Sequence, residues 1–146
     1  MAKTSERIQV GISPAATWAA ATDLDRYSEW LTLHDGWRSP VPRPSEITTG
    51  TTVSSVVIAK GTRVRFDWVI ATFVEGREIA LRGSGKGGIK AKLDLAVAPS
   101  GAGSTITFTL ELGGLPMMGP LGKAAVMAVA GDLRESLAAF DRVFGS

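Results

Sequence analysis

His34, the single histidine of this 146-residue chain, is the first residue whose side chain could do chemistry. A histidine base needs a nucleophile to activate or a carboxylate to orient its ring. Asp35 follows it directly and would usually point elsewhere, the chain has no cysteine, and no serine has a recognisable nucleophile setting. Trp30 and Trp37 flank the histidine and supply apolar area. We therefore interpret His34 as a weak catalytic candidate and favour a position at the rim of an apolar opening, beside Trp37.

Two arginines are the other candidates for catalysis. In TRVRFDW (62–68) charged residues alternate with apolar ones, so Arg65 lies on the outer face of a strand if Phe66 and Trp68 face inward. A bulge would reverse that direction. An inward arginine is suited to stabilise an enolate during aldol-type ring closure. Arg65 and Arg82, on the next predicted strand, are therefore weak candidates for a cyclase reaction.

The glycine-rich stretch GSGKGG (83–88) invites comparison with a phosphate-binding loop. A P-loop needs four residues between its first glycine and its Gly-Lys pair, then Ser or Thr, and then a helix. Here a glycine follows Lys86 and a strand follows the glycines, so the stretch is interpreted as a flexible hairpin. Lys86, Lys90 and Lys92 are interpreted as a solvated strand face, because the formal net charge is only +2. We expect no nucleic-acid partner.

The composition predicts one globular domain over residues 1–146, with 45% hydrophobic and 21% charged residues. The absence of cysteine and the single histidine predict no metal site and no redox cofactor. No apolar run approaches the roughly 18 residues of a membrane span, and the N-terminus lacks the apolar segment of a signal peptide. We expect a cytoplasmic protein with no stable membrane insertion.

The N-terminal third predicts the elements that must position these residues. RIQVGIS (7–13) alternates apolar with polar or small residues, as a half-buried strand does. SPAATWAAA (13–21) predicts a helix, because its Ser-Pro start suits the N-cap and the first helical position. TDLDRYSEW (22–30) predicts a second short helix. The prolines in 36–50 predict an irregular connection.

The remainder predicts about five antiparallel strands and a long helix. The strands are 51–59, 62–74, 77–83, 88–98 and 104–112, with the first turn at Lys60-Gly61. Apolar and polar residues alternate in the last two strands, so one face of the sheet is buried and the other is wet. From Pro120 to Phe144, apolar residues recur at spacings of three and four. This helix would be about 37 Å long.

The segment SPAATWAAATDLDRYSEW, with its Ser-Pro pair, Trp18, Asp23, Tyr27 and Trp30, resembles the START/Bet v 1-like (SRPBCC) superfamily, especially its bacterial polyketide cyclase/dehydrase and lipid-transport branch. The order of elements is similar over nearly the whole chain. EWLTLHDGWRS is similar to small actinobacterial proteins described as toxins of toxin–antitoxin pairs. The resemblance implies an α+β helix-grip fold. Its curved antiparallel sheet of six to seven strands wraps around the C-terminal helix, and two short helices follow the first strand.

The resemblance also implies an apolar cavity between the sheet and the helix. The residues allow a cavity or a solid core, because GGLPMMGPLGKAAVMAVAG (113–131) places small residues and adaptable methionines opposite large side chains of the sheet. Together they favour the cavity. The predicted lining is Phe66, Trp68, Leu93, Phe108, Leu110, Met118, Leu121 and Met127, with His34 and Trp37 near an opening.

These observations predict a protein that binds a hydrophobic small molecule such as a lipid, a polyketide or an aromatic metabolite. The first alternative is a polyketide cyclase or dehydratase, which requires an inward-facing arginine or glutamate in the cavity. The second alternative is the toxin of a toxin–antitoxin pair, which requires an antitoxin protein as partner.

Overall fold

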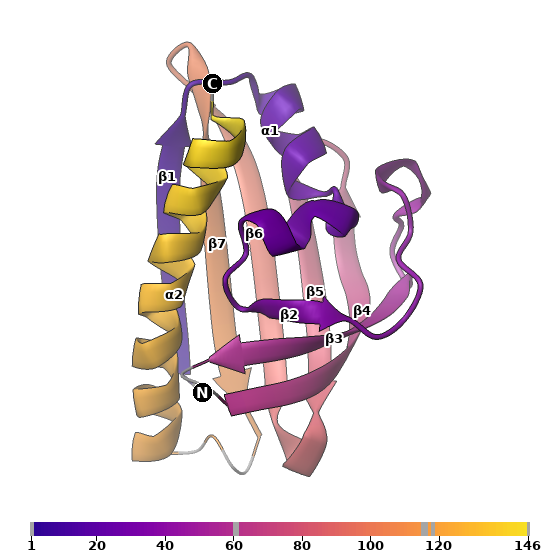
Figure 1. Cartoon of the computed structure of the whole chain (residues 1–146), viewed down its shortest axis with the longest axis vertical. Helices are drawn as coiled ribbons and strands as arrows, with labels where there is room; N and C mark the ends of the chain where they lie inside the picture. The colour runs from indigo at the N-terminus through magenta and orange to yellow at the C-terminus, as the bar shows by residue number, and fades with distance from the viewer. Residues whose placement is uncertain (1, 60–61, 115–116, 118, 146) are drawn as a thin grey trace.

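In the computed structural model, which describes residues 2–59, 62–114, 117 and 119–145, seven antiparallel strands form one curved sheet beside a long C-terminal helix (Figure 1). The strand order is β1-β7-β6-β5-β4-β3-β2. The strands are β1 (Ala2–Val10), β2 (His34–Trp37), β3 (Thr52–Ala59), β4 (Thr62–Val74), β5 (Glu78–Gly85), β6 (Lys90–Ser100) and β7 (Gly103–Gly113).

Two α-helices and three short 3-10 helices complete the described part of the chain. They are α1 (Pro14–Ala21), η1 (Leu24–Glu29), η2 (Pro44–Glu46), η3 (Lys86–Gly88) and α2 (Pro120–Phe144). The predicted cap of the first helix is confirmed, because the Ser13 hydroxyl accepts a hydrogen bond from the backbone N–H of Ala16 at 3.1 Å. The second predicted helix is present as the 3-10 helix η1.

The structure differs from the predicted elements in the N-terminal third. The first strand ends at Val10 rather than at residue 13, because Ser13 begins the cap of α1. The stretch predicted as an irregular connection contains the end of β2 and the helix η2. Strand β2 has only four residues, all half-buried, so it shows no alternation of apolar and polar residues. The predicted turn at Lys60-Gly61 lies outside the described residues.

The core lies between the concave face of the sheet and α2. On β6 and β7, side chains such as Leu95, Ile106 and Phe108 are at most 1% exposed, and polar residues alternate with them, as predicted. Leu133 and Phe140 of α2 are fully buried. The architecture is therefore the predicted α+β arrangement, in which a curved antiparallel sheet packs around a C-terminal helix (Figure 1).

The loop before β2 is attached to the middle of α2. The backbone N–H of Thr32 donates to the Ser136 hydroxyl at 2.9 Å, and that hydroxyl donates to the carbonyl of Asp132 at 2.8 Å. Trp30, which is 1% exposed, places its ring 5.1 Å from the ring of Phe140. These contacts fix β2, and with it His34, relative to the helix.

None of the helices in the described ranges has the length and apolar character needed to cross a membrane.

Candidate ligand cavity

A cavity of about 550 Å³ lies between the concave face of the sheet and the N-terminal half of α2. Cavities of this size hold small organic ligands. The sheet contributes apolar side chains from β3 to β7, and η1 and β2 contribute Leu24, Tyr27, His34 and Trp37. No Asp, Glu, Lys or Arg is present among the described residues that line it.

The helix wall of the cavity is made of small side chains. Leu121, Ala124, Ala125, Ala128 and Val129 line the cavity, and their spacing of three and four residues places them on one face of α2. Three of the five are alanines, which do not reach the opposite wall. Leu121 is 61% exposed, so solvent reaches the cavity wall at the first turn of the helix.

Two aromatic rings form part of the sheet wall, and two glycines make room for them. Trp68 pairs with Gly83 across β4 and β5, and Phe66 pairs with Gly85. A Cβ on Gly83 would lie 2.6 Å from the Trp68 ring, and one on Gly85 would lie 2.9 Å from the Phe66 ring. The two aromatic rings stack on each other at 5.1 Å. Gly83 and Gly85 belong to the stretch that the sequence predicts to be a flexible hairpin. In the structure they lie on β5 and leave room for the two aromatic rings.

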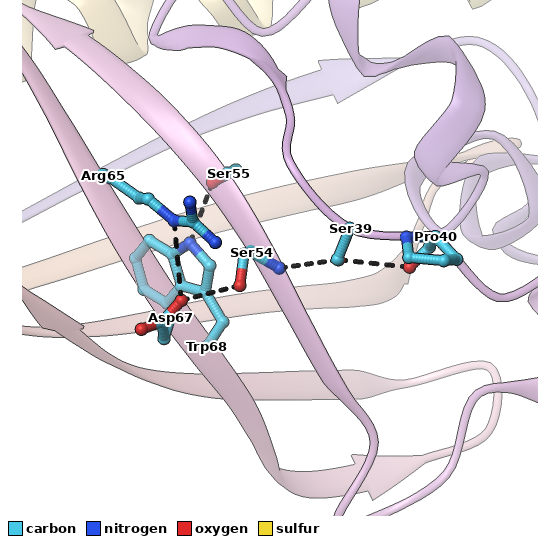
Figure 2. Close-up of polar contacts among 7 residues, drawn as sticks. All are labelled: Ser39, Pro40, Ser54, Ser55, Arg65, Asp67 and Trp68. Atoms are coloured by element: carbon cyan, nitrogen blue, oxygen red, sulfur yellow. Dashed lines mark hydrogen bonds and ion pairs between the residues drawn. The ribbon is translucent and has the colours of Figure 1, made fainter.

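A buried hydrogen bond holds the indole of Trp68 in place. Its N–H donates to the hydroxyl of Ser55 on β3 at 2.9 Å (Figure 2). Ser55 is 3% exposed and lines the cavity. Sequence analysis did not identify Ser55 as a site residue. The sequence holds one indication of its position: Ser55 lies on the same side of β3 as Val53 and Val57, and this side faces inward.

His34 belongs to an aromatic cluster at the β2 end of the cavity. Its ring lies 4.6 Å from the Trp37 ring and 6.1 Å from the Tyr27 ring. Burial lowers the pKa of His34 below its ordinary value, which the Asp35 carboxylate opposes and Arg38 reinforces. The imidazole is therefore neutral at neutral pH.

Tyr27 and Trp37 satisfy their own polar atoms within the protein. The Tyr27 hydroxyl donates to the carbonyl of Ala21 at 2.8 Å, and the Trp37 indole donates to the carbonyl of Leu24 at 2.8 Å. Burial raises the pKa of Tyr27 above its ordinary value, so the phenol stays protonated. Tyr27 is a second cavity residue that is absent from the predicted lining; the sequence marks it only as part of the segment that carries the family resemblance.

The structure brings most of the predicted lining residues together. Trp37, Phe66, Trp68, Leu93, Phe108, Leu110 and Leu121 all line the cavity, as does His34. Their roles in ligand binding remain predictions. Met127 does not line it: the side chain is 76% exposed on the outer face of α2, so this expectation is wrong. Successive residues of a helix are rotated by about 100°, and this rotation turns position 127, between Val126 and Ala128, away from the sheet. Met118 lies outside the described residues.

Arg65 and Arg82 lie on the convex face of the sheet, away from the cavity. The Arg65 side chain is 60% exposed and lies 3.9 Å from the carboxylate of Asp67, which accepts a hydrogen bond from Ser54 (Figure 2). Arg82 is exposed and lines a separate groove of about 750 Å³ with Lys90 and Lys92. The bulge between β4 and β5 falls at Ile70–Thr72, beyond Arg65, so the alternation around Arg65 is not reversed.

Over the described ranges, no three His, Asp or Glu side chains gather in a way that could hold a metal ion.

A curved antiparallel sheet around a C-terminal helix, with an apolar cavity between them, defines the helix-grip (Bet v 1-like) class of α+β proteins. Solved structures share this fold. A START superfamily protein from Mycobacterium smegmatis superposes with a TM-score of 0.76 at 16% identity, over 97% of this chain and 96% of that one. Ara h 8.0201 superposes with a TM-score of 0.70 at 13% identity, over 97% and 96%. At these identities the likeness establishes the fold alone.

The chain belongs to the family described as polyketide cyclase/dehydrase and lipid transport, whose model matches residues 1–145. Among its relatives is toxin Rv0910 of Mycobacterium tuberculosis, 43% identical over 144 residues, which are 99% of each chain. The predicted superfamily, its branch and the likeness to toxin-named relatives are confirmed.

Proposed function

We propose that this protein binds a hydrophobic small molecule in the cavity between the sheet and α2. The observation that carries the proposal is the lining itself: about 550 Å³ of space enclosed by apolar and aromatic side chains, with no charged residue among the described lining residues. Removing apolar ligand surface from water is worth about 25 cal/mol per Å². The family description, which includes lipid transport, supports the same proposal.

The experiment measures binding of N-phenyl-1-naphthylamine, an uncharged dye that fluoresces in apolar surroundings. The matched variants are Ala128→Trp and Met127→Trp. Ala128 lines the cavity, whereas Met127 is exposed on the same turn of α2. We expect the wild type and Met127→Trp to bind the dye alike, and Ala128→Trp to lose at least about tenfold in affinity because the indole fills the space. Absence of dye binding by the wild type, or unchanged binding by Ala128→Trp, would overturn the proposal.

The cyclase alternative has less support. Its two arginine candidates, Arg65 and Arg82, lie on the convex face, and no arginine or glutamate is among the described lining residues. An enolate formed in the cavity would meet no cation there.

A toxin function is a second candidate, because a relative named as a toxin is 43% identical over 99% of this chain. The test is to express the chain in its own host and measure growth. We expect growth arrest that is relieved when the reading frame beside the gene is co-expressed. Normal growth at high expression would remove this candidate. The Ala128→Trp variant then tells whether arrest requires an open cavity.

A further inference from the structure

Among the described side chains that line the cavity, Ser55 and His34 are those that can donate a hydrogen bond to a ligand. The polar side chains that line it are Tyr27, His34, Trp37, Ser55 and Trp68. As described above, the donors of Tyr27, Trp37 and Trp68 are all used within the protein. The donors left over for a ligand therefore belong to the other two residues.

Ser55 holds an unused donor inside the cavity. Its oxygen accepts from the Trp68 indole, and a hydroxyl that accepts also carries a proton to donate. No acceptor for that proton is found among the residues that the structure describes. Ser55 is 3% exposed and lines the cavity, so an acceptor for this proton has to come from a molecule inside the cavity. A buried donor without an acceptor is unfavourable. A ligand oxygen would therefore find both a partner and a fixed direction here, because the indole restrains the hydroxyl.

His34 lies on the strand next to Ser55, diagonally across from it. In the register of β2 and β3, His34 pairs with Val57 and Trp37 pairs with Ser55. Val57 and Ser55 are two residues apart on the same face of β3, a separation of roughly 7 Å along a strand. No hydrogen bond to the His34 ring is found in the described part of the chain, and its neutral imidazole offers one donor and one acceptor. Ser55 and His34 are thus two uncharged polar groups on neighbouring strands of the cavity wall.

We infer that the cavity selects an uncharged, mainly apolar molecule with one hydrogen-bond acceptor, such as a ketone, ester or ether oxygen, which accepts from the Ser55 hydroxyl beside His34. This inference rests on the proposed function and names the chemical class of its ligand. A carboxylate or phosphate would be buried without a cation, and an ammonium group without a carboxylate. Burying an unpaired charge is far more costly than burying a paired polar group. Arg65 and Arg82 are on the other face of the sheet, and Glu6, which shares the inner face of β1, is already paired with Arg134 of α2 at 2.8 Å.

The test compares ligands that share a chain length and differ in head group. 2-Undecanone, undecanoate and undecylammonium are each used to displace N-phenyl-1-naphthylamine from the wild-type protein. We expect the ketone to displace the dye at a concentration at least about tenfold lower than either ion. Equal or tighter binding of an ion would overturn the inference while leaving the proposed function intact. If the dye itself does not bind, the proposed function fails and the inference falls with it.

Variants at Ser55 then test the hydrogen bond. Ser55→Ala removes the hydroxyl, and Ser55→Thr keeps it. We expect Ser55→Ala to weaken 2-undecanone binding by about fivefold to tenfold, the usual scale of one hydrogen bond, and Ser55→Thr to retain most of it. The readout is the ratio of the two affinities: the dye, which has no carbonyl, should lose clearly less affinity than 2-undecanone in Ser55→Ala, and the two should change alike in Ser55→Thr.

A structural role for Ser55 would give a different result. Trp68→Phe removes the same indole–hydroxyl bond but keeps Ser55. If Ser55 only positioned Trp68, both Ser55→Ala and Trp68→Phe would weaken the dye and the ketone equally, and the inference would be wrong. A loss specific to the ketone in Ser55→Ala supports it.

Discussion

The two halves of helix α2 pack against the same sheet but leave different amounts of space. In the N-terminal half the residues that line the cavity include Ala124, Ala125 and Ala128. In the C-terminal half the inward positions include Leu133 and Phe140, both fully buried, and the cavity does not extend to them. The hydrogen bond from the backbone N–H of Thr32 to the hydroxyl of Ser136 attaches the loop before β2 to the C-terminal half.

The size of the side chains along α2 therefore decides where the core of this fold is filled and where it is open. The C-terminal half buries large apolar groups, including Phe140 against Trp30, and so contributes stability without a ligand. The N-terminal half leaves apolar surface of Phe66 and Trp68 in contact with a space that none of the described residues fills. A ligand that fills this space would complete the burial that the alanines leave undone.

Phe140→Ala gives the largest effect, because it breaks the solid half. Phe140 is fully buried, and its ring packs against Trp30 and Phe144. Truncating a buried phenylalanine typically costs about 3–5 kcal/mol. We expect a loss of that size in the free energy of unfolding measured with urea. Met127→Ala is the control on the exposed face of α2 and should change stability little. A loss below about 1 kcal/mol would mean that this half is not close-packed.

Exchanging alanine for leucine at one position in each half tests the comparison directly. Ala139 is 8% exposed in the solid half, and Ala125 lines the cavity. Adding methylenes to a filled core costs about 1–3 kcal/mol. We therefore expect Ala139→Leu to destabilise the fold by that amount. Ala125→Leu should leave stability unchanged or raise it slightly, because its side chain enters open space.

The same pair predicts opposite effects on binding. Ala125→Leu should weaken binding of N-phenyl-1-naphthylamine, because it takes volume from the cavity, whereas Ala139→Leu should bind the dye normally once folded. Equal destabilisation by the two substitutions would contradict the proposed division of α2.

Gly83→Ala tests how the sheet wall of the open half is built. The new Cβ would lie 2.6 Å from the Trp68 ring, so the indole must shift. The cavity beside the ring lets it move, and we expect a cost near the lower end of the usual range of about 1–3 kcal/mol for overpacking. Dye binding should weaken with it. Ser84→Ala, on the exposed face of the same strand, is the control and should change neither quantity appreciably. Normal dye affinity in Gly83→Ala would show that Trp68 does not form the wall.

The sequence predicted the fold through patterns that act locally. Ser13 and Pro14 specify the start of α1, and the alternation in β6 and β7 specifies which face is buried. The small residues of the N-terminal half of α2 indicated missing volume. Because that volume depends on which side chains meet across the core, the residues alone left a solid core open as the alternative.

The details of the site depend on contacts between distant strands, which local patterns do not reveal. Gly83 seats the Trp68 ring only through the register of β4 with β5. Ser55 becomes a partner of Trp68 only through the register of β3 with β4. Met127 was assigned to the cavity from its chemistry, but one residue is about 100° around a helix, and that rotation turns it to solvent.

The smallest predicted effect is a pH dependence of stability that arises at the cavity and not at the filled part of the core. His34 lines the cavity, and its burial holds its pKa below the ordinary value of about 6.5. Below that value the unfolded chain takes up a proton that the folded protein does not, so the unfolded state binds more protons. The free energy of unfolding should therefore fall as the pH drops from about 6.5 to the lowered pKa, and level off beneath it.

His34→Asn isolates this contribution, because its side chain is neutral throughout. Between about pH 7.5 and about pH 5.5, which bracket the ordinary histidine pKa, we expect the wild type to lose more stability than the variant in urea unfolding. The charged groups near the ring oppose each other: Asp35, paired with Arg63 at 3.6 Å, favours the imidazolium and Arg38 disfavours it. Desolvation therefore decides the sign. Because a charged ring at the cavity wall also disfavours an apolar guest, dye affinity should fall over the same pH range in the wild type and stay constant in His34→Asn. A wild type that gains stability on acidification relative to the variant would show that Asp35 outweighs burial, and that the β2 end of the cavity is wetter than its lining implies.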